Sequence, residues 1–117
     1  MTEIDKIRSY CISKQAVTES FPFDETSLVL KVGNKIFAIL SLDASHSINL
    51  KCEPERAVVL REENTYIEPG YHMNKRHWNT LKLDEAPYKQ VCELIDHSYE
   101  LVYNALSKKT KESIQNT

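Results

Sequence analysis

Two apolar runs joined by a two-residue turn limit what this chain can fold into more than any other feature. Residues 28–32 and 36–40 are rich in large and β-branched side chains, and Gly33 and Asn34 lie between them. A glycine at the first turn position suits a type II′ hairpin. A third run, residues 48–52, alternates apolar with polar side chains, which predicts a strand with one wet face. Together the three runs predict an antiparallel meander.

Helical periodicity accounts for three further segments. The clearest is the last, whose apolar residues recur at 3.6-residue spacing: Tyr88, Val91, Cys92, Ile95, Tyr99, Val102, Tyr103 and Leu106. Asp84 or Ala86 is expected to cap this helix, with Pro87 in its first turn. The pattern predicts a first helix over residues 2–14 and a second over residues 53–63.

Two short strands complete the pattern, one around residues 71–73 and one over residues 78–83. Residues 15–26 are expected to form a polar connector in which two phenylalanines anchor the loop against the core. The element order is then α-β-β-β-α-β-β-α, which predicts an α+β fold: a two-layer α/β sandwich in which helices cover an antiparallel sheet. We expect one domain over residues 1–107 and a polar, frayed tail over residues 108–117.

The composition is typical of a globular domain, with 117 residues, 41% hydrophobic and 27% charged side chains. No run approaches the roughly 20 apolar residues that a membrane span needs, and the acidic start lacks the apolar segment of a secretory signal. Cys11, Cys52 and Cys92 are widely spaced, form no CxxC pair and are expected to be reduced. We therefore expect a cytoplasmic monomer with no membrane partner.

The sequence gives little support for an enzyme. It contains only two glycines, which excludes a glycine-rich phosphate loop, and it has no GxSxG motif. Cys11 and Cys92 fall on apolar helix faces, where the pKa of a thiol rises and the group is inert. His72 and His77 lack the helical spacing and the neighbouring cysteines of a zinc site. We expect no catalytic residues, no cofactor and no metal.

Residues 69–81 are the segment most suggestive of function. This segment holds the single Trp78, and no acid occurs from Pro69 to Leu83, although the chain has a net charge of −2. Lys75 and Arg76 could neutralise phosphates. Other side chains of the segment could stack on bases or form hydrogen bonds with nucleic acid: Tyr71, His72, Asn74 and His77. Alternatively, Trp78 belongs to the core and the cations lie in a solvated turn. The residues alone leave both interpretations open.

Several stretches together resemble the MmcQ/YjbR family of small bacterial proteins over nearly the whole chain. The most specific is Pro-Gly-Tyr-His-Met-Asn-Lys-Arg-His-Trp-Asn-Thr at residues 69–80. The others are Tyr10-Cys11 with Glu19 and Phe21-Pro22-Phe23, residues 30–38, residues 50–55 with Leu60-Arg61, and residues 98–102. The family usually has Pro-Gly in the turn after the first helix. Here Gln15-Ala16 replaces it, which would loosen the turn and lengthen the helix.

The resemblance implies a fold similar to secretion chaperones and DNA binding through a double-wing arrangement, without catalytic residues or a cofactor. On this basis we expect a DNA-binding module in which Lys31, Lys35 and Lys51 assist the basic segment. The alternative is a non-catalytic, chaperone-like module that binds a protein partner along a sheet edge. A small-molecule site around Tyr71, His72 and His77 is a third, weaker candidate.

Overall fold

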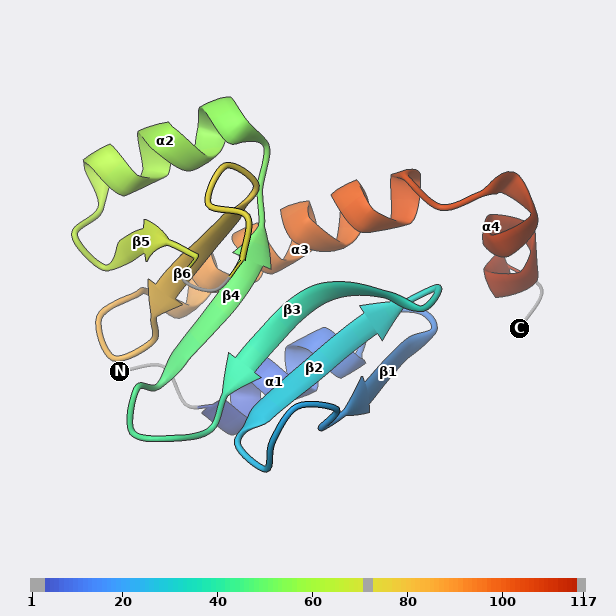
Figure 1. Ribbon diagram of the computed structural model, residues 1–117, viewed down its shortest axis with the longest axis horizontal. Coiled ribbons are helices and arrows are strands. Elements are labelled where there is room, and N and C mark those ends of the chain that lie inside the picture. Colours follow the sequence, from blue (N-terminus) through green and yellow to red (C-terminus); the bar gives the residue numbers. More distant parts are fainter. Residues whose placement is uncertain (1–3, 71–72, 116–117) are drawn as a thin grey trace.

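A six-stranded antiparallel sheet with helices packed on one face forms the frame of the molecule (Figure 1). The computed structural model describes residues 4–70 and 73–115. The predicted α+β class with its antiparallel sheet is confirmed. In chain order the elements are α1 (Ile4–Ile12), β1 (Val17–Ser20), β2 (Ser27–Val32), β3 (Lys35–Ser41), β4 (Ser47–Lys51), α2 (Pro54–Glu63), β5 (Ile67–Pro69), β6 (Trp78–Lys82), α3 (Tyr88–Asn104) and α4 (Lys108–Gln115).

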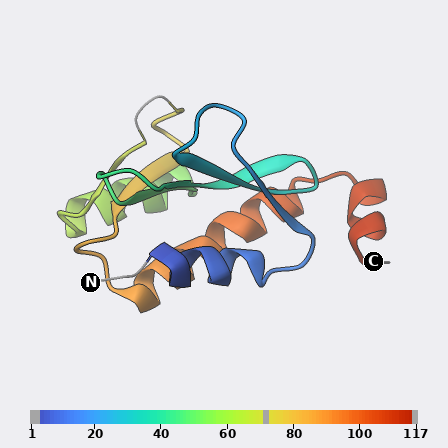
Figure 2. The ribbon, with the colours of Figure 1, turned by 90° about the horizontal axis from the view of Figure 1, so that it is seen from below.

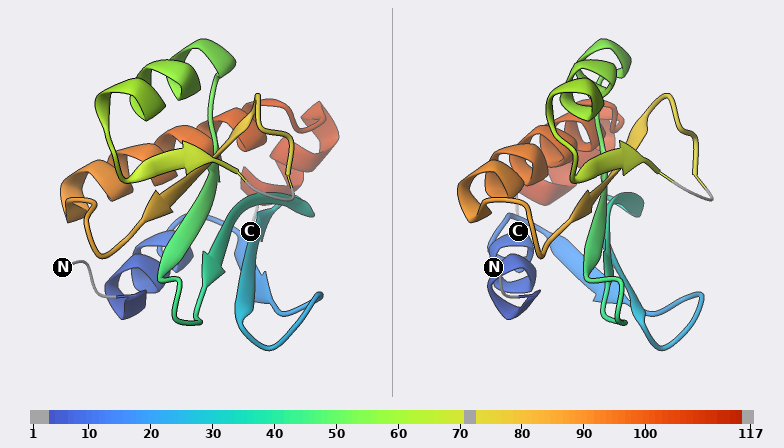
Figure 3. Two further views of the ribbon diagram at one scale, coloured as in Figure 1. Left: turned by 60° about the vertical axis from the view of Figure 1, so that its left-hand side comes forward. Right: turned by 90° about the vertical axis from the view of Figure 1, so that its left-hand side faces the viewer.

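The two faces of the sheet are covered differently. The strand order is β1-β2-β3-β4-β6-β5, and α1 and α3 pack together against one face (Figure 2). The β1–β2 loop and the described part of the β5–β6 loop project from the opposite face (Figures 2 and 3). α2 lies beside β5 and β6, and α4 stands beyond the end of α3 (Figure 1). The strands between the two loops therefore have no described helix over them.

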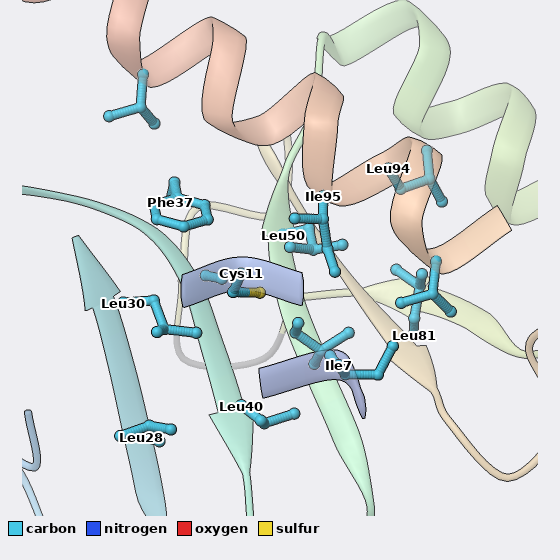
Figure 4. Close-up of a cluster of buried hydrophobic side chains, with 14 of the residues drawn as sticks. Ile7, Cys11, Leu28, Leu30, Phe37, Leu40, Leu50, Leu81, Leu94 and Ile95 are labelled. Carbon is cyan, nitrogen blue, oxygen red and sulfur yellow. The ribbon is translucent and has the colours of Figure 1, made fainter. Parts of the chain in front are cut away.

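Alternating side chains of the strands fill the space between the sheet and the helices. The pairing register places one buried row across five strands: Leu28, Leu40, Ile48, Leu81 and Ile67. Ile7 and Cys11 of α1, with Leu94 and Ile95 of α3, pack onto these strands (Figure 4). Each fully buried large apolar side chain contributes roughly 1.5–3 kcal/mol. The predicted apolar periodicities are therefore those of the core.

The β2–β3 hairpin turns at Gly33 and Asn34, as predicted, but with a different turn type. Both residues have positive φ, 57° and 65°, which indicates a type I′ turn rather than type II′. The pairing then shifts between Leu30 and Lys31, because Phe37 is an extra residue in β3. Such a bulge bends the strand and increases its twist. Beyond it, β3 curves away from β4 (Figure 1).

Two elements were not predicted. Residues 17–20, expected within a polar connector, form β1, which pairs with β2 and is held by an ion pair between Arg8 and Glu19. Residues 108–115, expected to fray, form α4, and its Ile114 is buried. The Nε2 atom of Gln15 donates a hydrogen bond to the carbonyl oxygen of Ile114 at 3.0 Å. This bond joins α4 to the turn after α1.

Two helix ends differ from the prediction. α3 begins at Tyr88 with Pro87 as its N-cap residue, so neither Asp84 nor Ala86 caps it. α1 ends at Ile12, so the expected lengthening of the first helix is wrong. Instead, Ala16 takes a left-handed conformation with a φ of 61°, which lets the chain reverse without a glycine.

Two loops also differ. The strand that pairs with β6 is β5, Ile67–Pro69. The strand predicted around residues 71–73 falls mostly outside the described ranges, which leave out residues 71 and 72. The side chains of Phe21 and Phe23 are 48% and 67% exposed, so they do not anchor the β1–β2 loop in the core. Among the described residues, no helix is both long and apolar enough to cross a bilayer.

Candidate functional site

The cations predicted as contacts gather at one end of the sheet. β2 ends and β3 begins there, with Lys31 opposite Ile36. β4 ends and β6 begins at the same end, with Lys51 opposite Trp78. The β5–β6 loop leaves the sheet at this end too (Figure 1). Antiparallel pairing thus brings together residues that are far apart in the sequence.

A groove of about 530 Å³ lies at this end of the sheet, and we call it the lysine groove. It forms where two strands diverge: β3–β4 pairing stops at Ala38 and Leu50, while β4 continues beside β6 to Lys51 and Trp78. α3, which passes behind these strands, completes the groove (Figure 1). The residues that line it are Lys31, Asn34, Lys35, Ile36, Lys51, Trp78, Val102 and Ala105.

The charge of the lysine groove has one sign. Lys31 and Lys51 are half-buried and Lys35 is exposed, and no acidic residue lines the groove. Within residues 4–70 and 73–115, the ion pairs of lysine and arginine involve other side chains, so none of these three lysines is paired with a carboxylate. Their fields therefore add, and the groove attracts anions despite the net negative charge of the chain.

The backbone of Trp78 is held by two hydrogen bonds at the rim of the lysine groove. The ring is half-buried rather than enclosed in the core. The Trp78 amide donates a hydrogen bond to the carbonyl oxygen of Asn74 at 3.0 Å, and the Trp78 carbonyl accepts one from the Gly70 amide at 2.9 Å. A Cβ atom at position 70 would lie 2.9 Å from the Cβ of Trp78. Glycine is therefore required at position 70 for this close approach.

A second groove, of about 630 Å³, lies between α2 and the β5–β6 loop, and we call it the Arg76 groove. It is lined by Pro54, Glu55, Val58, Arg61, Pro69, Lys75 and Arg76. Glu55 also lines a neighbouring hollow together with Glu53 and Arg76. The Arg76 groove therefore carries charges of both signs, in contrast to the lysine groove.

Side chains brace the β5–β6 loop beside the Arg76 groove. The Nη1 atom of Arg61 donates a hydrogen bond to the carbonyl oxygen of Lys75 at 2.8 Å. The Oδ1 atom of Asn74 accepts one from the Arg76 amide at 3.0 Å, which is an Asx turn. The carbonyl oxygen of His77 accepts a hydrogen bond from the Cys52 amide at 2.8 Å. These bonds hold Lys75 and Arg76, both exposed, on an ordered turn.

The structure divides the predicted contact residues into two sets. Lys31, Lys35 and Lys51 converge on Trp78, whereas Lys75 and Arg76 line the other groove. Asn74 and His77 have backbone or side-chain bonds that order the loop between the two grooves. Tyr71 and His72 lie outside the described residues, so the predicted small-molecule site around them stays a prediction.

Sequence reasoning missed Arg61 and the two non-lysine hairpin residues of the lysine groove. Arg61 lies on α2, 14 positions before the carbonyl that it binds, and no local pattern marks that contact. Asn34 and Ile36 were predicted to belong to the hairpin. Their place in a groove follows from the divergence of β3 from β4. The sequence signal that could have identified Asn34 and Ile36 is that they flank Lys35.

The cysteines and possible metal ligands offer no competing site in the described ranges. Cys11, Cys52 and Cys92 are free and buried. Burial is the main cause that raises the pKa of each thiol, to about 12 for Cys11, so a nucleophilic thiolate is disfavoured, as predicted. No group of three or more His, Cys, Asp or Glu side chains is placed there to hold a metal ion.

The sequence matches known proteins over most of its length. The family model described as YjbR matches residues 12–101. The Escherichia coli (strain K12) protein YjbR is 31% identical over 111 residues, which cover 93% of this chain and 94% of that protein. The protein YbdF of Escherichia coli O157:H7 is 34% identical over 97 residues, covering 81% of this chain and 80% of that protein.

Solved structures agree with these matches. The crystal structure of Deinococcus radiodurans protein DR2400 superimposes with a TM-score of 0.91 at 35% identity, covering 98% of this chain and 89% of that one. A crystal structure of a Pseudomonas syringae protein gives a TM-score of 0.73 at 27% identity, covering 87% of this chain and 99% of that one. The matched sequence segments and the shared fold lead to one conclusion: this chain belongs to the YjbR family.

Proposed function

We propose that this protein is a DNA-binding module that contacts its ligand at the cation-bearing end of the sheet. The observation that carries the proposal is the convergence of Lys31, Lys35 and Lys51 on one groove that no acid lines. Each lysine that approaches a phosphate releases condensed counterions, which gives affinity without base contacts. The three lysines come from paired strands, so their spacing is set by the sheet rather than by a mobile tail.

The two projecting loops support the same proposal. The β1–β2 loop and the β5–β6 loop flank the face that α1 and α3 leave open (Figures 2 and 3). We infer that these loops act as the two wings of a double-wing arrangement, with one loop on each side of the bound DNA. The β5–β6 loop adds the exposed Lys75 and Arg76. Glu53 and Glu55 lie close to Arg76, so we expect this wing to contribute less than the lysine groove.

Binding to fluorescently labelled oligonucleotides tests the proposal. We expect measurable binding at about 50 mM salt that weakens steeply towards 200 mM, because phosphate contacts dominate non-specific affinity. The double variant Lys31→Ala/Lys51→Ala should weaken binding, and the slope of log K against log salt should shallow by about 0.9 per lost contact on duplex DNA. Lys75→Ala/Arg76→Ala should have a smaller effect of the same kind.

The control removes two lysines from the helical layer. Lys6 on α1 and Lys89 on α3 are exposed and lie on the covered side of the sheet. Lys6→Ala/Lys89→Ala changes the net charge by the same amount as the Lys31/Lys51 variant, and it should leave the salt slope unchanged. Absence of binding to both duplex and single strands at low salt would reject the proposal, as would equal losses in the control variant.

A protein-interaction module is the second candidate function, and the β1–β2 loop favours it. Phe21 and Phe23 are 48% and 67% exposed next to β1, which is an edge strand of the sheet. An exposed edge with neighbouring aromatic side chains can accept a strand from a partner. Recovery of one stoichiometric protein that survives nuclease treatment, and that is lost when Phe21 and Phe23 are both replaced by serine, would favour this function over DNA binding.

A further inference from the structure

Trp78 is the one aromatic ring that the lysine groove contains. Phe37, the aromatic residue of β3, is fully buried and makes an edge contact with Tyr99 of α3 at 5.4 Å between ring centroids. Trp78 is only half-buried and has no ring contact of this kind among the described aromatic pairs. Part of its indole surface is therefore available to a ligand in the groove.

The groove pairs this ring with other apolar surface. Ile36 lies on the hairpin side, and α3 contributes Val102 and Ala105. The volume, about 530 Å³, falls within the roughly 300–1,000 Å³ of ordinary ligand pockets. An apolar recess with one aromatic ring suits a flat, largely apolar group such as a nucleobase. Asn34, exposed at the turn, supplies both a hydrogen-bond donor and an acceptor for the edge of a base.

The cations of the recess lie in a row beside the ring, which suits the phosphates of a bound strand. Lys51 is directly opposite Trp78 in the β4–β6 pair, whereas Lys31 and Lys35 lie on the other strand pair. In the strand order all three lysines therefore lie on the β4 side of Trp78, where the phosphates next to a stacked base would meet a row of positive charge. Aromatic platforms combined with basic grooves are the usual means of binding single strands.

Only an unpaired base can use such a ring. In a duplex both faces of each base are already stacked, and a protein reaches a face only by extruding the base at an energetic cost. We propose that the lysine groove binds single-stranded DNA, with one unpaired base stacked on Trp78 and its neighbouring phosphates on Lys31, Lys35 and Lys51, an inference that rests on the DNA-binding function proposed above.

A structural role for the lysines makes a different prediction. The C-terminal end of α3, at Asn104, carries the negative end of the helix dipole, and nearby cations would complement it. If this were their whole role, DNA would not enter the groove and the environment of the indole would not change on adding DNA. Fluorescence of Trp78, the single tryptophan of the chain, distinguishes the two roles directly.

The experiment titrates the full chain with three probes at low salt: an oligothymidylate of about 12 nucleotides, a duplex with the same number of phosphates, and free thymidine monophosphate. We expect oligothymidylate to quench Trp78 fluorescence at saturation and to bind at least tenfold more tightly than the duplex. Duplex binding of equal or greater strength without quenching would overturn the inference and leave the proposed function intact. Mononucleotide binding as tight as that of the oligomer would also overturn it, since the groove would then be a nucleotide site.

Variants at position 78 distinguish the effect of an aromatic ring from the effect of a large apolar side chain. Trp78→Leu should weaken oligothymidylate binding by roughly tenfold, measured by anisotropy of a labelled oligomer, whereas Trp78→Phe should retain most of it. Tyr88→Leu, which removes an exposed ring from the helical face, is the control and should have no effect. Equal binding by all three variants would overturn the inference. If no probe binds at all, the proposed function itself fails. If Trp78→Leu does not fold, the quenching titration of the unaltered chain still decides.

Discussion

At Ala16 the chain accepts a backbone conformation that its side chain disfavours. The residue has a φ of 61°, in the region where a Cβ atom costs about 1–2 kcal/mol relative to the right-handed form. A glycine at this position would take the same conformation without that cost. Two hydrogen bonds hold the turn in this conformation in spite of the side chain of Ala16. The Nε2 atom of Gln15 bonds to Ile114, and the Tyr99 hydroxyl donates to the Gln15 carbonyl at 2.7 Å.

We therefore expect Ala16→Gly to stabilise the protein. Relief of the left-handed strain should outweigh the added flexibility of the unfolded chain, for a gain of about 0.5–1 kcal/mol in the free energy of unfolding. Urea denaturation measures it. Ala44→Gly is the matched control: Ala44 is also exposed but does not have a positive φ, so the same substitution should lower stability slightly. A loss of stability in both variants would contradict the assignment of strain to Ala16.

Trp78 shows how far a single residue could be interpreted in advance. Its place at the start of a strand was predictable from the apolar residues that follow it, and the structure begins β6 there. Its partial exposure was not, because this depends on the close approach of Gly70, which follows β5, and on the departure of β3 from β4. Neither of these two features can be recognised from the residues next to Trp78 in the sequence.

Among the elements, β1 and α4 escaped prediction for opposite physical reasons. β1 is short and mostly exposed, so it lacks the alternation that marks a half-buried strand, and pairing with β2 defines it. α4 has one buried apolar residue, Ile114, and therefore no repeated apolar spacing. Its packing partners, Gly33 and Tyr103, lie in other elements. α3 and the β2–β3 hairpin were predictable because their patterns repeat over many residues.

At the junction between β4 and α2, a histidine of α3 predicts a pH dependence of stability. The Nε2 atom of His97, on α3, accepts a hydrogen bond from the Glu53 amide at 3.3 Å. Burial, and then the charge of Arg56, lowers the pKa of His97, while Glu53 and Glu100 raise it by a smaller amount. A protonated ring would lose its acceptor and could not make this bond.

The sign of the dependence follows from linkage. Since the folded pKa lies below the unfolded value of 6.5, the unfolded state binds more protons as the pH falls, and stability declines from about pH 7 until the folded pKa is passed. We expect urea midpoints of the unaltered protein to fall more between pH 7.5 and 5 than those of His97→Gln, whose amide keeps an acceptor but does not titrate. Parallel profiles for the two proteins would contradict this role of His97.

On the scale of the whole molecule, the fold was largely predictable and the site only in part. Alternation and helical spacing predicted the α+β class with its antiparallel sheet, and the structure has that class. The same patterns placed Lys31, Lys35 and Lys51 on strands and the hairpin, but no sequence pattern indicated that they meet in one groove beside Trp78. That meeting depends on the bulge at Phe37 and on the end of β3–β4 pairing at Ala38.

The structure divides the basic segment, which the sequence predicts to be one surface. The loop turns so that Lys75 and Arg76 line a groove with Glu55, while Trp78 lines another. Flanking acids in the sequence gave a hint of this mixture, because Glu53 and Glu55 begin α2. The site that we propose is therefore centred on the lysine groove, with the loop at its side.

Backbone amide chemical shifts in the ¹⁵N-labelled protein, followed while oligothymidylate is added, test this claim most directly. We predict that the largest shifts occur at the residues of the lysine groove, at Lys31, Asn34, Lys35, Ile36, Lys51 and Ala105, and at the indole N–H of Trp78. Smaller shifts are expected at Lys75 and Arg76. Shifts confined to α1 and α3 on the covered face, or to the Arg76 groove alone, would contradict the account, as would a spectrum that DNA does not change.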